Sequence, residues 1–493
     1  MQRRMRRRWI AATIFLLIML LIGRPLIFLS YHYIKDHRAM PPKARPGYPD
    51  DASHMNETKM DSLVLVEPMP DKAEKQLQNL VLFAARGHRV ISIGGARHSM
   101  GGQTLYPGGI LIDMRGYNQM HLDSANNVLS VGSGALWSEV VPYLNKYGKS
   151  VLIMQTNNSF TVGGSLSVNC HGWQVGSGPI ASSVLSFRLL MADGKICTCS
   201  RSENPQLFSL IPGGYGLFGI ILDVKLKVTD NKTYRMYQYV MPSGDYLKAF
   251  RERVNNNPRI GMIYGRINVN QDDFANEAIL STFRIDDSVA IPALKAPGLS
   301  AFRRTVFRSS AGSEYGKALR WHLEKLVVKL GKGKIFSRNQ LMNEPVDIYQ
   351  NSEAGYADIL HEYFIPADSI NRFIDEIRRT IPKYKVDLMN ITIRNVLEDR
   401  DAYMCYARKE VFGFVMLFNE AVDPGADREM RNLTQKLVDI AISLGGTYYL
   451  PYRLHATREQ FYRAYPMAQD FFKLKKKYDP EEIFQNQFYK TYK

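Results

Sequence analysis

The chain has 493 residues, with 64 Lys and Arg against 47 Asp and Glu, four cysteines, and a hydrophobic fraction of 45%. This length is enough for two or three domains, and the hydrophobic content excludes a largely disordered chain. Four cysteines exclude a disulfide scaffold, and because none forms a CxxC pair, no metal site is expected.

The net charge of +17 is concentrated at the start of the chain, since residues 1–38 carry +7 of it. The remaining +10 fits an anionic substrate or an anionic membrane surface, and a soluble protein with a basic surface is the alternative. No nucleic-acid-binding motif accompanies the charge, so no nucleic-acid partner is expected.

One N-terminal transmembrane helix is expected within residues 1–38, which would form a membrane anchor. An uncharged stretch over 9–23 follows five arginines, and Trp9–Leu29 reaches the length of a spanning helix when Arg24 extends to the interface. A cleaved signal peptide is the alternative, but no small-residue cleavage site follows. The arginines predict a cytoplasmic N-terminus, and therefore a single-pass membrane protein with its catalytic body on the extracytoplasmic (periplasmic) side.

Residues 39–62, rich in Pro and polar residues, are predicted to be a linker. A strand predicted over 90–93 then leads directly into a turn with four glycines in 94–102. A second glycine-rich turn covers 161–167 and precedes a His-Gly step at 171–172. Such turns let the backbone bend tightly or let another group approach closely.

The remaining hydrophobic pattern is that of a mixed α and β chain. Helices are predicted over 71–85, 137–147, 368–380 and 428–444, and strands over 109–114, 128–131, 184–191, 222–228, 360–366, 389–396, 412–418 and 448–453. The Gly214-x-Gly216-x-x-Gly219 sequence fits a dinucleotide-binding fingerprint in spacing only, because a strand and not a helix follows it. A nicotinamide cofactor is therefore not expected.

Several motifs in this order resemble the vanillyl-alcohol oxidase / p-cresol methylhydroxylase (PCMH) superfamily of FAD enzymes. They are GG-x-RHS at 94–99, TVGG at 161–164, HG at 171–172 and PGGYG-x-FG at 212–219. The likeness is strong over 63–230. It extends to 456–493, which is similar to the closing segment of sugar-alcohol and aldonolactone oxidases and of decaprenylphosphoryl-ribose oxidase.

The resemblance implies an α+β fold with a two-subdomain PCMH-type FAD-binding domain over 63–230. An α/β substrate (cap) domain follows over 231–455, with a basic insertion at 300–340. The segment 456–493 is expected to return to the FAD domain.

FAD carries an anionic pyrophosphate, and backbone N–H groups in glycine-rich turns can cradle it. Tight turning alone is the other explanation for these glycines. The cofactor-binding candidates are Gly94, Gly95, Ala96, Arg97, His98, Ser99, Gly102, Thr161, Gly163, Gly164, Ser167, His171, Gly172, Gly214 and Gly219.

The resemblance also implies a covalent bond between His98 and the flavin, because a histidine at this place carries that bond in some members of the family. A neutral imidazole is a competent nucleophile, so the residue type fits. The alternative is a histidine that hydrogen-bonds the turn or packs on the flavin ring. No cysteine precedes the second glycine turn, so a second linkage is not expected.

The cap is expected to hold the substrate, and its catalytic candidates are Tyr452, Arg453 and His361. A structural, hydrogen-bonded role is the alternative for each. A lysine stands near the place of Tyr452 in decaprenylphosphoryl-ribose oxidase, so that catalytic lysine does not carry over. The insertion 300–340 carries +8 and an apolar helical stripe, which fits either an interfacial helix or a basic helix packed on the core.

Together these features predict a membrane-anchored FAD-dependent oxidoreductase that acts on a CH–OH group by hydride transfer to flavin N5. A sugar, polyol, lactone or polyprenyl-linked sugar would be the substrate. The alternative is a catalytically idle flavin-binding protein with a role in membrane assembly. The sequence leaves open the electron acceptor, and with it the choice between oxidase and dehydrogenase.

Overall fold

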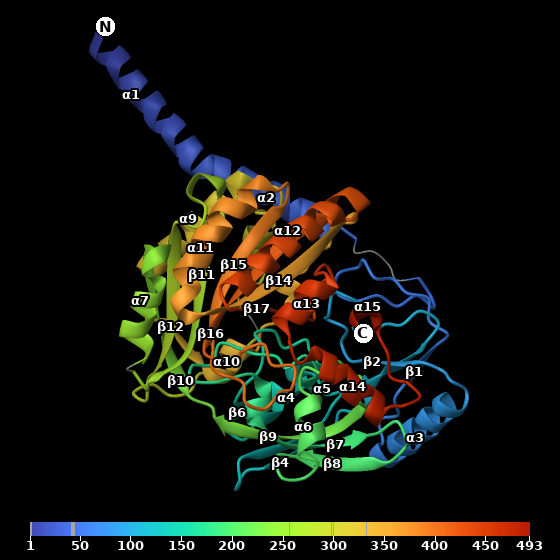
Figure 1. The fold of residues 1–493 in the computed structure, drawn as a ribbon. Helices are drawn as coiled ribbons and strands as arrows, with labels where there is room; N and C mark the ends of the chain where they lie inside the picture. Colours follow the sequence, from blue (N-terminus) through green and yellow to red (C-terminus); the bar gives the residue numbers. More distant parts are fainter. Residues whose placement is uncertain (1, 41–44, 256, 297, 299, 332) are drawn as a thin grey trace.

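The structure, a computed structural model, describes residues 2–40, 45–255, 257–296, 298, 300–331 and 333–493. Its mixture of helices and sheets confirms the expected α+β class. A first domain, residues 45–230, lies below a larger cap, residues 231–455, and the last residues of the chain run back toward the first domain (Figure 1).

The first domain contains two sheets. Three parallel strands in the order β1-β3-β2 form the smaller sheet, and β4-β5-β9-β7-β8 form the larger one, with β6 also paired to β9. The strands are β1 (Ser62–Leu65), β2 (Ile91–Gly94), β3 (Ile110–Asp113), β4 (Met120–Asp123), β5 (Val128–Gly132), β6 (Lys149–Val151), β7 (Val184–Leu190), β8 (Ile196–Ser200) and β9 (Ile220–Asp230). The helices are α3 (Pro70–Arg86), α4 (Trp137–Asn145), α5 (Val162–Ser167) and α6 (Pro205–Leu210).

The cap is one antiparallel sheet of eight strands in the order β13-β10-β12-β11-β15-β16-β14-β17. The strands are β10 (Thr233–Pro242), β11 (Ile260–Ile267), β12 (Glu277–Ile285), β13 (Ile335–Ser337), β14 (Tyr356–Pro366), β15 (Asp387–Val396), β16 (Val411–Ala421) and β17 (Thr447–Tyr448). Its helices are α7 (Tyr246–Phe250), α8 (Ser300–Arg308), α9 (Glu314–Leu330), α10 (Arg338–Met342), α11 (Ile370–Thr380) and α12 (Pro424–Ser443). Helices α11 and α12 cover the outer face of the sheet, which leaves the inner face for the first domain.

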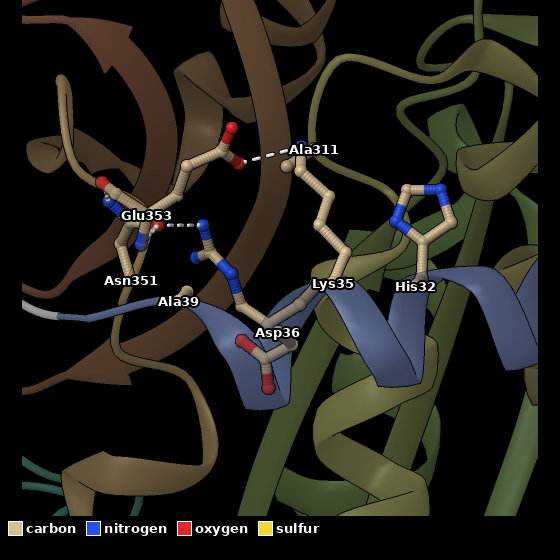
Figure 2. Close-up of a pocket in the computed structure, with 8 residues that line it drawn as sticks. His32, Lys35, Asp36, Ala39, Ala311, Asn351 and Glu353 are labelled. Atoms are coloured by element: carbon tan, nitrogen blue, oxygen red, sulfur yellow. Dashed lines mark hydrogen bonds and ion pairs between the residues drawn. The ribbon is translucent and has the colours of Figure 1, made fainter.

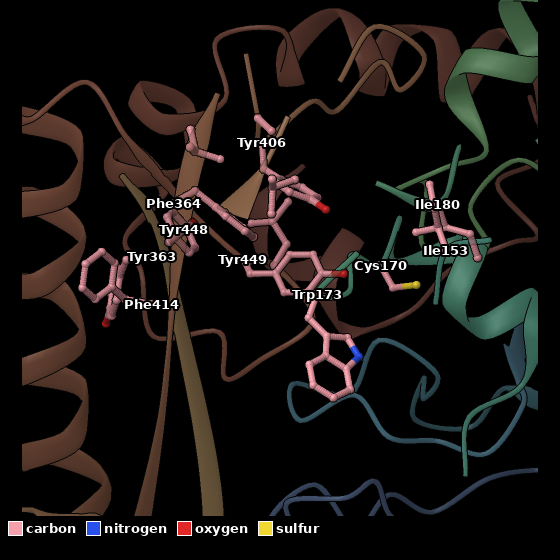
Figure 3. Packing of buried hydrophobic residues seen from close by; sticks show 14 of the residues in the cluster. Ile153, Cys170, Trp173, Ile180, Tyr363, Phe364, Tyr406, Phe414, Tyr448 and Tyr449 are labelled. Carbon is pink, nitrogen blue, oxygen red and sulfur yellow. The ribbon is translucent and has the colours of Figure 1, made fainter. Parts of the chain in front are cut away.

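One hydrophobic core joins the two domains (Figure 3). Phe364 of β14 stacks on Tyr406 with ring centroids 4.1 Å apart, and Tyr449 meets Phe364 edge-on. Cys170 and Ile180 of the first domain belong to the same core. Because such a core is closely packed, it fixes how the inner face of the cap sheet lies over the glycine-rich turns.

The C-terminal helix α13 (Arg458–Ala464) packs against α12 of the cap, and α14 (Ala468–Tyr478) and α15 (Gln487–Tyr492) lie beside the first domain. Between α14 and α15 the chain adds to the smaller sheet, where Ile91 N–H donates to Ile483 O at 2.6 Å. Asp479 accepts bonds from the N–H groups of Ile483 and Phe484 and pairs with Lys475 in the interior. This acid therefore fixes the returning segment.

The expected transmembrane helix is not supported by the structure. Among the described residues, no helix is long and apolar enough to cross a membrane. The stretch is divided into α1 (Gln2–Ile18), a π-helical turn (Met19–Gly23) and α2 (Arg24–Arg38). Arginines occupy the start of α1, and α2 begins with the next arginine, so the apolar part between them is short.

Helix α2 instead packs against the basic insertion of the cap, which forms α8 and α9 (Figures 1 and 2). Asp36 pairs with Arg304 of α8 through two contacts of 2.5 and 2.7 Å. Lys35 pairs with Glu353 at 2.8 Å, as Figure 2 shows. The Arg24 guanidinium lies 4.0 Å from the ring centre of Tyr315 at the start of α9.

The predicted linker is also partly an ordered element. Within 45–61, the carboxylate of Asp51 is buried and accepts bonds from Gly102 N–H and Ser53 Oγ. Ala52 N–H donates to Arg97 O at 3.0 Å. The segment therefore holds the first glycine-rich turn in place.

Candidate active site

A cavity of about 1110 Å³ lies between the glycine-rich turns of the first domain and the inner face of the cap sheet. This volume exceeds the usual range for a small-molecule pocket, roughly 300–1,000 Å³, so there is room for two ligands. We call its first-domain walls the cofactor side and its cap walls the substrate side.

Most of the predicted cofactor residues lie together on the cofactor side. These are Gly94, Gly95, Ala96, Arg97, His98, Ser99, Thr161, Gly163, Gly164, Ser167, His171 and Gly219. Gly102, Gly172 and Gly214 do not line the cavity, because each packs behind it against Gln487, Met154 O and Leu210 O respectively. Those three glycines permit close packing and are not contact residues.

The two glycine-rich turns touch each other at Gly95, where a Cβ atom would lie 2.1 Å from Thr161 Oγ1. Gly163 of the second turn packs on Ser133, which follows β5, and a Cβ atom there would lie 2.6 Å from Ser133 Cβ. Neither distance is possible for a real side chain. Arg97, between the glycines, has a φ of 54° and so holds the turn in the left-handed region.

His98 lies at the end of the first turn with its ring against Phe160, the centroids 4.3 Å apart. Its Nε2 is 3.1 Å from Ser159 O. Because a carbonyl can only accept, Nε2 carries the proton and Nδ1 keeps a free lone pair. Burial lowers the pKa of the imidazole, so His98 is neutral at pH 7.

A buried pair of ionisable residues joins the cofactor side to the cap. His171 Nε2 lies 2.6 Å from Glu362 Oε1, and both side chains are almost fully buried. Glu362 comes from β14, which brings its carboxylate over the His-Gly step of the first domain. Tyr452 O–H donates to the other oxygen, Oε2, at 3.3 Å. The carboxylate is therefore bonded from two sides and lines the cavity.

Arg394 of β15 lines the same end of the cavity beside this pair. Its Nε has no hydrogen-bond partner among the described residues. Burial lowers the pKa of its guanidinium, and the charge of Glu362 opposes this. Asn390, on the same face of β15, also has an unbonded Oδ1. The Nε–H of Arg394 is free to donate to an oxygen atom of a ligand, and Oδ1 of Asn390 is free to accept from a ligand hydroxyl.

Two of the three predicted catalytic residues do not reach the cavity. His361 lies on the outer face of β14, where Tyr363 Oη and Thr434 Oγ1 bond its ring, and burial lowers its pKa to about 3. Arg453 pairs with Asp427 at 2.5 Å, away from the cavity. Tyr452 alone lines it.

The sequence prediction missed Glu362 by one position, because alternate residues of a strand face opposite sides. Asn390, Thr392 and Arg394 share one face of β15, and that face lines the cavity. Alternation along the predicted strand 389–396 places the three on one face, but it does not say which face of a strand is the inner one.

Comparisons with known proteins bear on the cofactor side. Residues 69–200 match the family model of the FAD binding domain. An uncharacterized oxidoreductase of the fasciation locus of Rhodococcoides fascians is 24% identical over 61% of this chain and 64% of its own length. Cytokinin dehydrogenase 2 of Arabidopsis thaliana is 31% identical over 34% of each chain, and cytokinin dehydrogenase 6 of Oryza sativa subsp. japonica is 24% identical over 83% of each. The chain thus spans less than two thirds of the length of the first two relatives.

The residues of the cofactor side fit FAD. Four hydroxyl groups that line it have no partner among the described residues, namely those of Ser99, Thr104, Ser133 and Thr156. Unbonded buried hydroxyls are costly, so they indicate a polar ligand. Together with the glycine turns, they suit the ribityl and pyrophosphate oxygens. FAD is therefore the cofactor of this chain.

Proposed function

We propose that residues 69–200, which match the family model of the FAD binding domain, belong to the PCMH-type superfamily, and that the chain is an FAD-dependent oxidoreductase that oxidises a hydroxyl-bearing substrate. The observation that carries this proposal is the buried His171–Glu362 pair, bonded to Tyr452 and facing the cofactor side. An idle flavin-binding protein would have no use for it.

When bound, FAD supplies the acceptor for the hydride of the substrate C–H bond. Glu362 accepts the proton of the substrate hydroxyl, while His171 donates Nε2–H to Oε1 across the 2.6 Å contact and so holds the carboxylate in place. The free Nε–H of Arg394 donates to a further substrate oxygen, and Oδ1 of Asn390 accepts from a further substrate hydroxyl, which together orient the reacting carbon. A positioned general base of this kind contributes about 10²–10⁴-fold in rate.

The test is anaerobic mixing of the FAD-loaded full chain with hydroxylated compounds and with the matching deoxy compounds. The proposal expects sugars, polyols, lactols or lipid-linked alcohols to bleach the flavin while the deoxy partners do not. If dithionite reduces the flavin but no alcohol of the panel does, the chain is the idle flavin-binding protein.

We also propose that His98 binds the flavin covalently through Nδ1, the nitrogen that Ser159 O leaves unprotonated. Attachment would form one N–C bond and break one C–H bond of the flavin methyl group, with release of one proton and two electrons. The linked imidazole would keep its Nε2 proton and become cationic, and the two electrons would pass to the acceptor that reoxidises the flavin in turnover. Acid denaturation of the loaded chain should leave flavin fluorescence on the polypeptide, and His98→Ala should release it all. Complete release from the unsubstituted chain would refute covalent attachment.

Residues 1–38 are proposed to attach the chain to a membrane, with the catalytic body outside the cytoplasm. Exposed Trp9, Ile10 and Leu16 on α1, next to a run of exposed arginines, support this attachment. Fractionation of cells that express the full chain or residues 39–493 tests it, since only the full chain is expected with the membranes. Protease treatment of intact cells then tests the orientation.

A further inference from the structure

The cavity extends far beyond Glu362 across the inner face of the cap sheet. Its polar end lies on β14, β16 and β15, and the strands that follow are β11, β12, β10 and β13. Neighbouring strands lie about 4.8 Å apart, so β10 is about 14 Å from β15. A ligand that fills the substrate side is therefore elongated, and the lining of the far end determines its chemistry.

The far end is apolar. Met236, Ile279, Phe283 and Phe336 line it from the sheet, and Phe307 and Leu323 line it from α8 and α9. Gln238 and Gln340 are polar exceptions. The amide of Gln238 already donates to Ser281 Oγ at 3.0 Å, and Oε1 of Gln340 accepts from Lys295 N–H at 2.8 Å. This lining suits a hydrocarbon chain, whose burial tightens binding about fourfold for each methylene group.

The cavity opens to solvent beside this apolar end. Phe302 of α8 and Val327 of α9 line the cavity and are 52% and 43% exposed. Further along α9, Leu330 is 77% exposed but does not line the cavity. Lys334 stands at the same opening. The mouth is thus a place where an apolar chain can leave the cavity among exposed apolar and basic side chains.

Between the two ends lies an unbalanced cluster of charges. Arg266 of β11 and Arg320 of α9 share one carboxylate, Glu324, at 3.1 and 3.5 Å. All three line the cavity, and Arg266 Nε has no partner among the described residues. Burial and the charge of Arg266 lower the pKa of Arg320 to about 10, and the charges of Glu324 and Asp387 oppose this. Asp387 is itself paired with Lys317 at 2.8 Å. Arg266 and Arg320 therefore carry one positive charge more than Glu324 balances, and an anionic group would neutralise it.

We propose that this cavity binds an anionic amphiphile, with its oxidisable hydroxyl at Glu362, its anionic group at Arg266 and Arg320, and its hydrocarbon chain over β12, β10 and β13 toward the mouth at Val327. The inference rests on the proposed function, because it names the substrate class for the same site.

The test measures calorimetric dissociation constants of butyl, hexyl, octyl and decyl phosphate for the FAD-loaded full chain, each below its micelle-forming concentration. The expected affinity rises about fourfold per methylene group and levels off once the chain reaches the mouth. An affinity that is independent of chain length would overturn the proposal.

Two variants with matched controls locate the groups. Val327→Asp places a charge in the path of the ligand's hydrocarbon chain. It should weaken the binding of decyl phosphate about tenfold and leave the binding of butyl phosphate unchanged. Leu330→Asp, on the same helix but outside the cavity, should change neither. Arg266→Gln should weaken every alkyl phosphate about tenfold without affecting the matching alcohols. Equal effects of the two Asp variants, or an equal loss for phosphates and alcohols, would contradict the assignment.

This inference and the proposed function fail in different ways. If short alcohols reduce the flavin but chain length has no influence, the amphiphile is wrong and the oxidoreductase stands. If alkyl phosphates bind as expected but no alcohol reduces the flavin, the cavity is a lipid-binding site and the catalytic proposal is wrong.

Discussion

The cofactor side and the substrate side of one cavity are built in different ways. On the cofactor side, backbone turns form the wall: Gly95 lets the first turn touch Thr161 of the second, and Gly163 lets the second turn pack on Ser133. On the substrate side, side chains on separate strands converge, as Glu362 and Arg394 do. A site built from backbone suits the cofactor, which stays the same whatever the substrate is. A site built from side chains can change its substrate through single substitutions.

The outer face of the cap sheet adds a contrast within the same strands. Its buried polar residues, such as His361, bond to helix α12 and not to a ligand. The segment after β17 shows the same division, since Tyr452 enters the cavity while Arg453 is held by Asp427. Comparing variants of residues that line the cavity with variants of residues on the outer face of the cap sheet therefore tests whether only the first group acts on FAD or the substrate.

The largest effect on FAD binding is expected from Gly95→Ala on the cofactor side. The added Cβ would lie 2.1 Å from Thr161 Oγ1, so the two turns must separate. Overpacking of this kind costs about 1–3 kcal/mol, which is expected to weaken FAD binding by about 10–100-fold. The loss of FAD binding is measured as the FAD content per chain after dialysis. Gly244→Ala is the control, because nothing lies within 4 Å of its Cβ position. Equal FAD retention in both variants would contradict a backbone-built site.

A smaller effect, about tenfold in the rate of flavin reduction, is expected from Tyr452→Phe, since it removes the hydroxyl that bonds Glu362. His361→Asn, one residue from Glu362 but on the outer face, should leave that rate unchanged and lower only the free energy of unfolding. Stopped-flow measurement of flavin reduction, together with urea unfolding, distinguishes the effect of Tyr452→Phe from that of His361→Asn. If His361→Asn slows reduction more than Tyr452→Phe does, the assignment of the faces is wrong.

The smallest effect concerns Glu420 on the outer face of β16. Burial and the charge of Asp427 raise the pKa of its carboxyl from 4.5 to about 7. The folded state therefore binds more protons than the unfolded state between these values, so the free energy of unfolding falls as pH rises through them. Glu420→Gln removes that fall and should be more stable at pH 8 by at most about 3 kcal/mol, with no gain at pH 4.5. Urea unfolding across pH measures it, and the exposed Glu459→Gln should show no such gain. An equal gain at both pH values would contradict the raised pKa.

The cofactor side was largely predictable from the sequence because the residues that form it are close together in the sequence. A strand that runs into four glycines and a histidine is visible within one short segment, and the structure keeps His98 at the cavity. Gly102, Gly172 and Gly214 were misassigned because glycine in a turn looks the same whether it faces a ligand or a neighbouring carbonyl oxygen.

The substrate side was less predictable because its determinants depend on pairing between distant strands. Glu362 meets His171 across 191 positions of sequence, and no local pattern records that contact. The docking of α2 on α8 through Asp36 and Arg304 was missed for the same reason. The lack of charge over residues 9–23 indicated an apolar segment before α2, but it did not indicate where α2 would pack.

The most direct test of the account is one preparation of Glu362→Gln, assayed for FAD per chain and for the rate of anaerobic flavin reduction by a substrate alcohol. Glutamine keeps the shape of the side chain and removes the base that faces the cavity. The account predicts FAD content equal to that of the unsubstituted chain and reduction slower by at least about 100-fold. Reduction at the original rate, or a loss of FAD that accounts for the whole decrease, would contradict it.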